Sequence, residues 1–218
     1  MGGPLLLLLL LLGAASGAVA NVEKVIFTGP AAGAGLVLPD RLGALTPAAP
    51  VLRTNLSRAA DGPGAEAWLL LGDLDEGRRY ELRVCWAAIE PTSFSLQLHD
   101  PSSIAATPAL ARLLAAHALP GPPARRRDAT APARQLLLRI RATADYFADD
   151  ARLMARPPPV LVDLVLDPFL AGLVPRSLAP TLAYLALVAL VAWPLARWLV
   201  AGLRSAAGSA PGRAEKRD

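Results

Sequence analysis

The sequence predicts a mainly β protein in which an antiparallel β-sandwich is followed by a single transmembrane α-helix. Several short segments alternate apolar and polar residues, and clusters of turn-forming residues separate them. These segments do not alternate with helical patterns in the rhythm that indicates a parallel sheet. Near the C-terminus, Ser177 to Ala196 contains no charged residue. At about 1.5 Å of rise per residue, this segment is long enough to cross roughly 30 Å of hydrocarbon.

The N-terminal residues have the composition of a secretory signal peptide. Leu5 to Leu12 is a run of eight leucines, and small residues follow it up to Ala18-Val19-Ala20. The run is too short to span a bilayer, and the last three residues have the A-x-A form that signal peptidase accepts. We therefore expect residues 1–20 to be removed by cleavage after Ala20. The alternative is an uncleaved anchor, because Met1 to Pro4 contains no Lys or Arg.

Residues 21–176 carry the strand patterns of one β-rich domain, which is large enough to enclose a core. In Ser93 to His99, for example, Phe94, Leu96 and Leu98 lie on one face of the expected strand and polar residues lie on the other. The expected strands, in chain order, are residues 21–28, 36–38, 51–55, 65–71, 80–88, 93–99, 135–144 and 160–166.

The sequence around Tyr80 refines the fold class. Gly72 to Gly77 is rich in turn-forming residues, and Tyr80 follows this turn at the start of a strand. The pattern resembles the tyrosine corner of immunoglobulin-like and fibronectin-like sandwiches, in which the tyrosine hydroxyl bonds to upstream backbone. The strand then alternates. Its expected core face carries Tyr80, Leu82, Val84 and Trp86, and its opposite face carries Glu81, Arg83 and Cys85.

Residues 101–134 interrupt the strands with a segment rich in Ala, Pro and Arg. A short helix is expected from about Pro108 to Ala118, because Leu110, Leu113 and Leu114 share one helical face. Closely spaced Pro and Gly residues end it. We expect the remainder of the segment to be a low-complexity, partly disordered loop.

The expected transmembrane helix covers residues 177–200, and residues 201–218 form a short basic tail. After Ala196 the chain contains five Lys and Arg residues but only two acidic residues, which favours a cytosolic C-terminus and a luminal N-terminal domain. Ala183, Ala186 and Ala189 are spaced by three and would permit close approach of a partner helix. A plain membrane anchor is the alternative interpretation of the same segment.

The charge distribution and a few single residues limit the classes of function that we expect. The formal net charge is +4, but the basic residues are scattered, so we expect no nucleic-acid binding. Cys85 is the only cysteine and cannot form an internal disulfide; we interpret it as a semi-buried thiol or, alternatively, as the site of an intermolecular disulfide. Asn55-Leu56-Ser57 is an N-glycosylation sequon within the expected luminal domain.

The pattern of titratable residues predicts neither catalysis nor a metal or cofactor site. His99 and His117 are the only histidines, and neither has the spacing of a metal ligand. Asp149 and Asp150 are adjacent, so their side chains diverge rather than form a catalytic pair. No glycine-rich phosphate loop opens a helix. We therefore expect a protein that is not an enzyme and has no cofactor, metal or small-molecule substrate of its own.

Two segments resemble a known family. Tyr80 to Trp86, continuing to Glu90-Pro91-Thr92-Ser93-Phe94, and Pro159 to Pro168 are similar to the accessory, non-catalytic subunit of glycosylphosphatidylinositol (GPI) mannosyltransferase II, a fungal family of the endoplasmic reticulum. The order of signal peptide, luminal domain, single span and short tail is similar as well. The resemblance implies a subunit that stabilises or positions a polytopic enzyme, which adds the second mannose of the GPI-anchor precursor. It carries over no catalytic residues.

The expected protein is therefore a single-pass type I glycoprotein of the endoplasmic-reticulum membrane. Its expected partners are a polytopic mannosyltransferase catalytic subunit and, through the span, membrane lipid. One alternative is the accessory subunit of GPI mannosyltransferase I, which has a similar topology. Another is a luminal cargo receptor or chaperone that binds folding clients.

Overall fold

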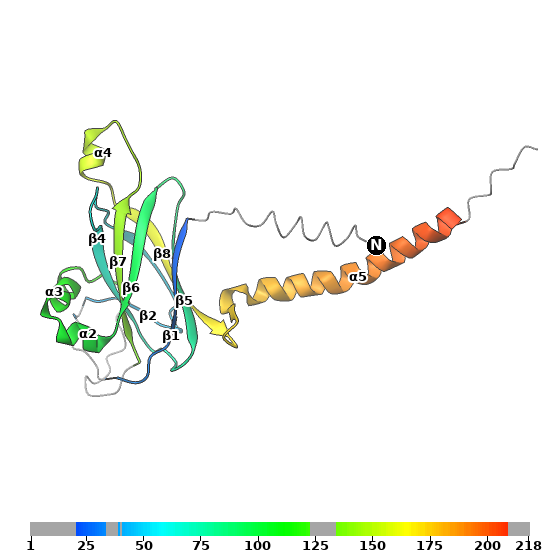
Figure 1. Cartoon of the computed structure of the whole chain (residues 1–218), viewed down its shortest axis with the longest axis horizontal. Helices are drawn as coiled ribbons and strands as arrows, with labels where there is room; N and C mark the ends of the chain where they lie inside the picture. The colour runs from blue at the N-terminus through cyan, green and yellow to red at the C-terminus, as the bar shows by residue number, and fades with distance from the viewer. Residues whose placement is uncertain (1–20, 34–38, 40, 123–133, 209–218) are drawn as a thin grey trace, which may run out of the picture. The chain divides into compact units, whose positions relative to one another are not determined.

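The structure is a computed structural model that describes residues 21–33, 39, 41–122 and 134–208 (Figure 1). It is mainly β, with antiparallel sheets and one long apolar helix near the C-terminus. The chain divides into two compact units, with the boundary between Leu173 and Val174, and each unit is considered by itself. The predicted signal peptide with Ala20, the expected strand at 36–38 and most of the low-complexity loop lie outside the described residues.

The first unit contains two β-sheets. Sheet 1 has the strand order β1-β5-β8-β3, in which neighbouring strands are antiparallel. Sheet 2 has the order β2-β4-β7-β6, in which the short β2–β4 pair is parallel and the other pairs are antiparallel. The strands are β1 (Val22–Thr28), β2 (Ala44–Leu45), β3 (Val51–Leu56), β4 (Ala65–Leu71), β5 (Arg79–Trp86), β6 (Thr92–His99), β7 (Leu136–Ala144) and β8 (Val160–Leu170).

Apolar side chains of the two sheets meet in one core. Alternate residues of β5 and β8 reach it from sheet 1, and alternate residues of β4 and β7 reach it from sheet 2, because successive side chains of a strand point to opposite faces. Each buried side chain of this kind contributes roughly 1.5–3 kcal/mol relative to an exposed one. Among the most deeply buried are Leu69, Leu71, Tyr80, Leu82, Val84, Leu138, Ile140, Val162, Leu164 and Leu166.

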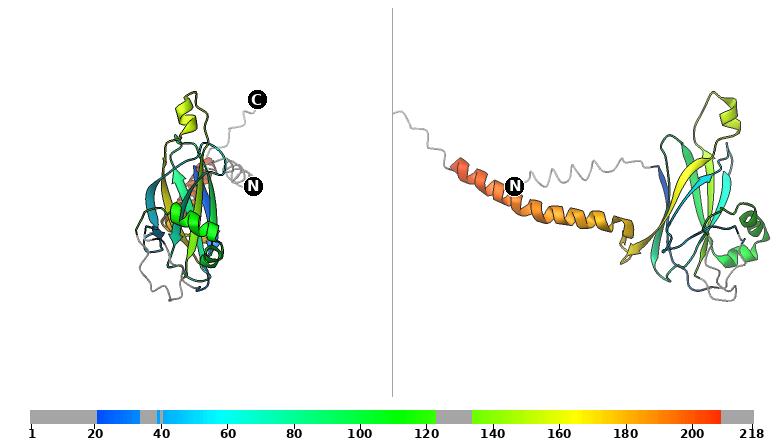
Figure 2. Two further views of the ribbon diagram at one scale, coloured as in Figure 1. Left: turned by 90° about the vertical axis from the view of Figure 1, so that its left-hand side faces the viewer. Right: turned by 180° about the vertical axis from the view of Figure 1, so that it is seen from behind.

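Two helices, α2 (Pro101–Ala106) and α3 (Pro108–Ala116), form a third layer on the outer face of sheet 2 (Figures 1 and 2). Trp68 and Leu70 of β4 point to this side, whereas Leu69 and Leu71 point into the core between the sheets. Strand β4 is therefore buried on both faces, which explains its unbroken apolar run. The second cluster consists of Leu42, Ala44, Trp68, Leu70, Ile104, Leu114 and Leu137.

The predicted tyrosine corner is present at the turn between β4 and β5. The backbone N–H of Asp75 donates a 2.9 Å hydrogen bond to the hydroxyl of Tyr80, a residue that is fully buried. Phe27 of β1 stacks on the Tyr80 ring, with the ring centroids 5.6 Å apart. Gly77 has a φ of 72° in this turn, a conformation that glycine adopts without steric cost. The corner fixes the chain where it passes from sheet 2 to sheet 1.

Most of the expected elements are confirmed. Seven of the predicted strands correspond to β1 and β3 to β8, with ends that agree within four residues, and α3 confirms the helix expected near Pro108. Two helices of the first unit were not expected, α2 and the five-residue helix α4 (Ala151–Ala155). The expected antiparallel sheets are confirmed with one exception, because the short strand β2, which was not expected, joins the edge of sheet 2 in parallel with β4. In this position Leu45 enters the core and Ala44 enters the second cluster.

The second unit contains the short strand β9 (Val174–Pro175), the 3-10 helix η2 (Arg176–Leu178) and helix α5 (Ala179–Gly208). With 30 residues, α5 is about 45 Å long, and it is long and apolar enough to cross a membrane. All side chains from Thr181 to Ser205 are exposed. The helix extends past residue 200, the expected end of the span, into residues that were assigned to the tail.

The tyrosine corner leads to a prediction about stability. Tyr80→Phe removes the hydroxyl that accepts the Asp75 N–H, so we expect a loss of about 1–2 kcal/mol in the free energy of unfolding. Pulse proteolysis of the full chain in mild detergent, across a urea series, measures this change. Tyr184→Phe, which removes an exposed hydroxyl on α5, serves as the control and is expected to leave the midpoint unchanged. Equal midpoints for Tyr80→Phe and the unchanged chain would contradict the role of the corner.

Candidate functional site

The outer face of sheet 1 combines exposed apolar residues with charged residues and is one candidate functional surface. Ile26, Val51 and Leu161 on this face are each between 42% and 57% exposed. Strand pairing places them there, because they share the register of residues that point away from the core. The face also carries Glu81, Arg83 and Cys85, in agreement with the alternation predicted for β5.

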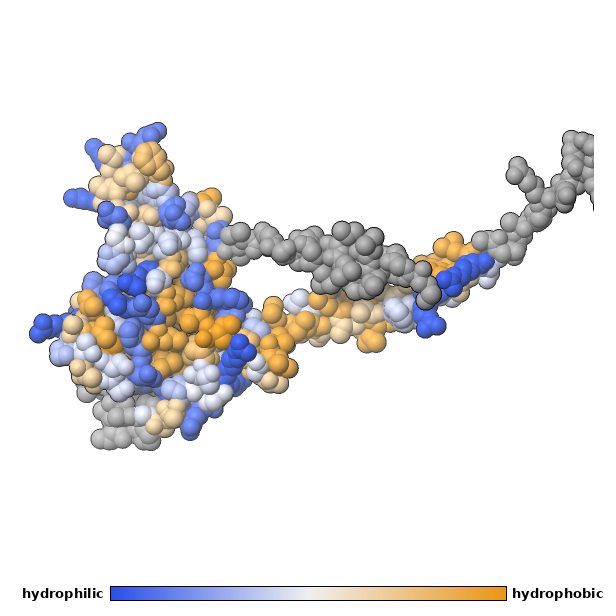
Figure 3. Space-filling model, viewed as in Figure 1, coloured by the Kyte–Doolittle hydropathy of each residue, from blue (hydrophilic) through white to orange (hydrophobic). Residues whose placement is uncertain are grey.

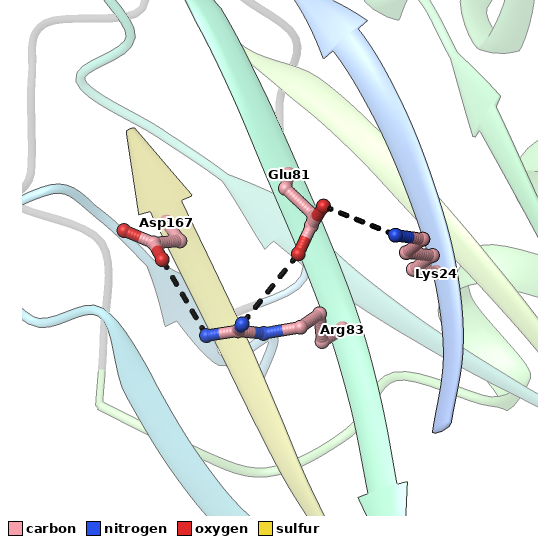
Figure 4. A network of polar contacts seen from close by, with 4 residues as sticks. All are labelled: Lys24, Glu81, Arg83 and Asp167. Carbon is pink, nitrogen blue, oxygen red and sulfur yellow. Dashed lines mark hydrogen bonds and ion pairs between the residues drawn. The ribbon is translucent and has the colours of Figure 1, made fainter. Parts of the chain in front are cut away.

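Four charged residues form a network across β1, β5 and β8 of this face (Figure 4). Arg83 lies between two carboxylates: its Nη1 is 3.6 Å from Glu81 Oε1, and its Nη2 is 3.4 Å from Asp167 Oδ2. The Nζ atom of Lys24 is 3.6 Å from Glu81 Oε2. Glu81 and Asp167 stand directly opposite each other in the β5–β8 pairing, and they are only 5% and 4% exposed.

The charges of this network balance, which makes the burial of its carboxylates possible. Like charges directly opposite on neighbouring strands repel each other, and removal from water adds a cost of several kcal/mol per ion. Arg83 and Lys24 bring two positive charges to the two carboxylates. Because Arg83 contacts both, its loss would leave two nearly buried negative charges side by side.

The Arg53–Asp163 pair on the same face is a contrasting case. Arg53 donates hydrogen bonds of 2.6 and 2.7 Å to the two carboxylate oxygens of Asp163. The hydrogen bond and the positive charge of Arg53 lower the pKa of Asp163. However, the two side chains are 69% and 32% exposed, so water screens the pair. It makes a smaller contribution to stability than its short distances suggest.

Two residues selected from the sequence also lie on the outer face of sheet 1. Asn55 is exposed on β3, whereas Leu56 of the same sequon is buried in the core. Cys85 is a partly buried free thiol, and burial raises its pKa despite the opposing charge of Arg83. A thiol with a raised pKa forms little thiolate at neutral pH, which fits the interpretation of Cys85 as a semi-buried thiol.

The outer face of sheet 2 holds a polar cluster that the sequence analysis missed. Arg139 of β7 donates a hydrogen bond to Glu66 of β4, and its guanidinium lies 5.8 Å from the centre of the Trp68 ring. The His99 ring is 5.3 Å from the same indole. Burial and the charge of Arg139 lower the pKa of His99, so its neutral form is favoured. Glu66 and Trp68 are spaced by two on β4 and so share one face, but only the pairing of β7 with β4 and β6 brings Arg139 and His99 to them.

Burial and the neighbouring Arg139 act on the pKa of Glu66 in opposite directions. Burial alone disfavours its ionised form, yet the hydrogen bond and the charge of Arg139 outweigh burial and lower the pKa of Glu66. The result is a stable ion pair held against Trp68 beside α3. This arrangement links β4 and β7 of sheet 2.

The three alanines selected as partner-facing residues lie on α5. Ala183, Ala186 and Ala189 are all exposed. At about 100° per residue, steps of three spread them over roughly 120° of the helix surface. They therefore form a strip of small side chains on one side of the helix, and their contact with a partner stays a prediction.

Within the residues that the structure describes, no group of three or more His, Cys, Asp or Glu side chains is placed to hold a metal ion. Comparisons of the chain with models of protein families, with curated proteins and with solved structures found no match. The surfaces of the chain and the resemblance of its strand sequences are therefore the evidence that bears on its function.

The charge network leads to a prediction with a control on the same face. Arg83→Met leaves Glu81 and Asp167 without their shared cation, so we expect a loss of about 3–5 kcal/mol in the free energy of unfolding. Arg53→Met removes an arginine from an exposed ion pair and should cost much less. The two variants are compared by pulse proteolysis in urea. A similar loss for both would show that burial of the carboxylates does not matter.

Proposed function

We propose that the protein is a non-catalytic membrane subunit of a polytopic mannosyltransferase, which adds the second mannose in GPI-anchor biosynthesis. The observation that carries this proposal is helix α5, an apolar helix of 30 residues whose described side chains from Thr181 onward are exposed. A helix of this composition requires lipid or protein around it. In the proposal α5 spans the endoplasmic-reticulum membrane, with the β domain in the lumen and the basic tail in the cytosol.

The family resemblance supports the same function. The segments that carry it correspond to β5, the start of β6, and β8. Strands β5 and β8 pair at the centre of sheet 1 and supply core residues and three of the four residues of its charge network. The resemblance thus concerns residues that build the domain. In the proposal this domain holds and orients the enzyme, and the catalytic subunit performs the sugar chemistry.

We also infer that the two-sheet domain belongs to the immunoglobulin-like and fibronectin-like sandwiches. The tyrosine corner supports this class, because the Tyr80 hydroxyl bonds to the backbone of Asp75 where the chain changes sheets. The helical layer and the parallel β2–β4 pair are then additions to the common plan.

Depletion of the protein tests the proposed function. We expect GPI precursors that carry a single mannose to accumulate, because the second mannosylation step has lost its accessory subunit. Labelling with radioactive mannose or inositol, followed by thin-layer chromatography of the lipids, measures the precursors, and re-expression of the chain should restore the profile. Precursors without mannose would instead indicate a subunit of GPI mannosyltransferase I. An unchanged profile would contradict both forms of the proposal and favour a cargo receptor or chaperone.

The exposed sequon tests the orientation. Asn55→Gln is expected to abolish a change in electrophoretic mobility on endoglycosidase treatment, since a luminal Asn55 lies exposed on β3. Ser57→Thr keeps the sequon and should retain the change. If the unchanged chain shows no endoglycosidase-sensitive shift, a glycosylated luminal domain is ruled out.

A further inference from the structure

Three connections between the two sheets meet at one end of the β domain. They join β3 to β4, β5 to β6, and β7 to β8, and α4 marks this end in Figure 1. Strand pairing brings them together, because Trp86 at the end of β5 lies opposite Val162, and Thr92 at the start of β6 lies opposite Ala144. We name this surface the loop end; it consists of residues 57–64, 87–91 and 145–159.

Two large apolar side chains at the loop end are almost completely exposed. Ile89 is 89% exposed and Phe147 is 85% exposed. Their loops touch, because the backbone N–H of Asp145 donates a 3.1 Å hydrogen bond to the carbonyl of Pro91. Ile89 is two residues from Pro91, and Phe147 is two residues from Asp145, so the chain places each within about 7 Å of this hydrogen bond. Large apolar side chains presented by adjoining loops are typical of an interaction site.

Hydrogen bonds of the buried Arg58, and one at the start of α4, hold the loops of this end in place. Arg58, which is only 7% exposed, donates to the carbonyl of Pro158 at 2.7 Å and to Thr92 Oγ1 at 3.1 Å. Its guanidinium also lies 5.5 Å from the ring of Tyr146, the residue before Phe147. The Asp150 side chain accepts the N–H of Arg152 at the start of α4. A surface ordered in this way loses little conformational entropy when a partner binds.

Acidic residues outnumber basic residues at the loop end. The loop end contains five carboxylates and three arginines, one of which is the buried Arg58, although the whole chain has a net charge of +4. A local excess of negative charge favours a partner with positive charges around its apolar residues. It disfavours an anionic membrane surface and the loop end of a second copy, since both would place negative charges face to face. The carboxylates are those of Asp61, Glu90, Asp145, Asp149 and Asp150.

We propose that the loop end binds a polypeptide segment of the mannosyltransferase in which apolar side chains are flanked by Lys or Arg residues. Ile89 and Phe147 insert into apolar sites of this segment, and the surrounding carboxylates pair with its basic residues. The identity of the partner rests on the proposed function. The chemistry of the bound segment follows from the loop end alone.

The first experiment compares the amount of catalytic subunit that co-purifies with full-length chains from membranes in mild detergent. For Ile89→Ser/Phe147→Ser we expect recovery to fall about tenfold or more, because residues at the centre of an interface dominate its binding energy. Leu173→Ser, which alters an apolar residue that is 80% exposed after the end of β8, away from the loop end, should leave recovery unchanged. Pulse proteolysis checks that both variants fold. Unchanged recovery with the folded double variant overturns the inference.

A second comparison tests the charges. Glu90→Lys/Asp149→Lys reverses two carboxylates of the loop end and should lower recovery of the catalytic subunit, with a larger effect at low salt than at high salt. Glu76→Lys reverses an exposed charge in the turn between β4 and β5, at the other end of the strands, and should have no effect. Equal recovery for both charge variants overturns the role assigned to the carboxylates.

A photoreactive phenylalanine analogue at Phe147 identifies what covers the loop end in native membranes. A crosslink to a Lys- or Arg-flanked apolar segment of the polytopic enzyme, weakened by Ile89→Ser, supports the docking. The same kind of segment from another identified protein supports the docking chemistry but contradicts the proposed function. Crosslinks to lipid or to a second copy of the chain overturn the docking. If the enzyme co-purifies but Phe147 crosslinks to nothing, the proposed function stands and the docking inference fails.

Discussion

The pairing of β5 with β8 determines both the core and the charged surface of sheet 1. In the observed register Leu82 and Val84 enter the core, and Glu81 stands opposite Asp167 on the outer face. A shift by one residue would turn every side chain of one strand to the other face. Such a shift would bury charge and expose leucine. The same pairing also creates the need for Arg83, because two carboxylates face each other at that position.

The parts of the fold that local sequence signals specify were predictable. The alternation along β5 predicted which residues face the core, and the turn before Tyr80 predicted the corner that the Asp75 hydrogen bond forms. The covering of sheet 2 was not predictable in the same way. Trp68 and Leu70 belong to an apolar run that indicates burial on both faces, but no nearby residue indicates that α2 and α3 cover them.

The candidate surfaces also differ in whether the local sequence predicts them. The sequon and the small residues of α5 were found from short motifs, because each motif consists of residues that are close together in the sequence. One partner of Arg83, Asp167, lies 84 residues away, and only the strand register brings the two together. Ile89 and Phe147 were missed for another reason. An isolated apolar residue in a loop has the same appearance in a sequence whether it is buried or exposed.

The late position of β8 in the chain has a consequence for the order of events during synthesis. Asn55 pairs with Leu161, and among the strands that the structure describes β3 has β8 as its one neighbour in sheet 1. At ribosomal rates of 5–20 residues per second, the hundred or so residues between them take roughly 5–20 s to appear. Within the proposed topology, an oligosaccharide would be transferred to Asn55 before β3 has paired with β8. When β8 then pairs with β3, Asn55 and its sugar would lie on the outer face of sheet 1, and Leu56 would be buried in the core on the other face.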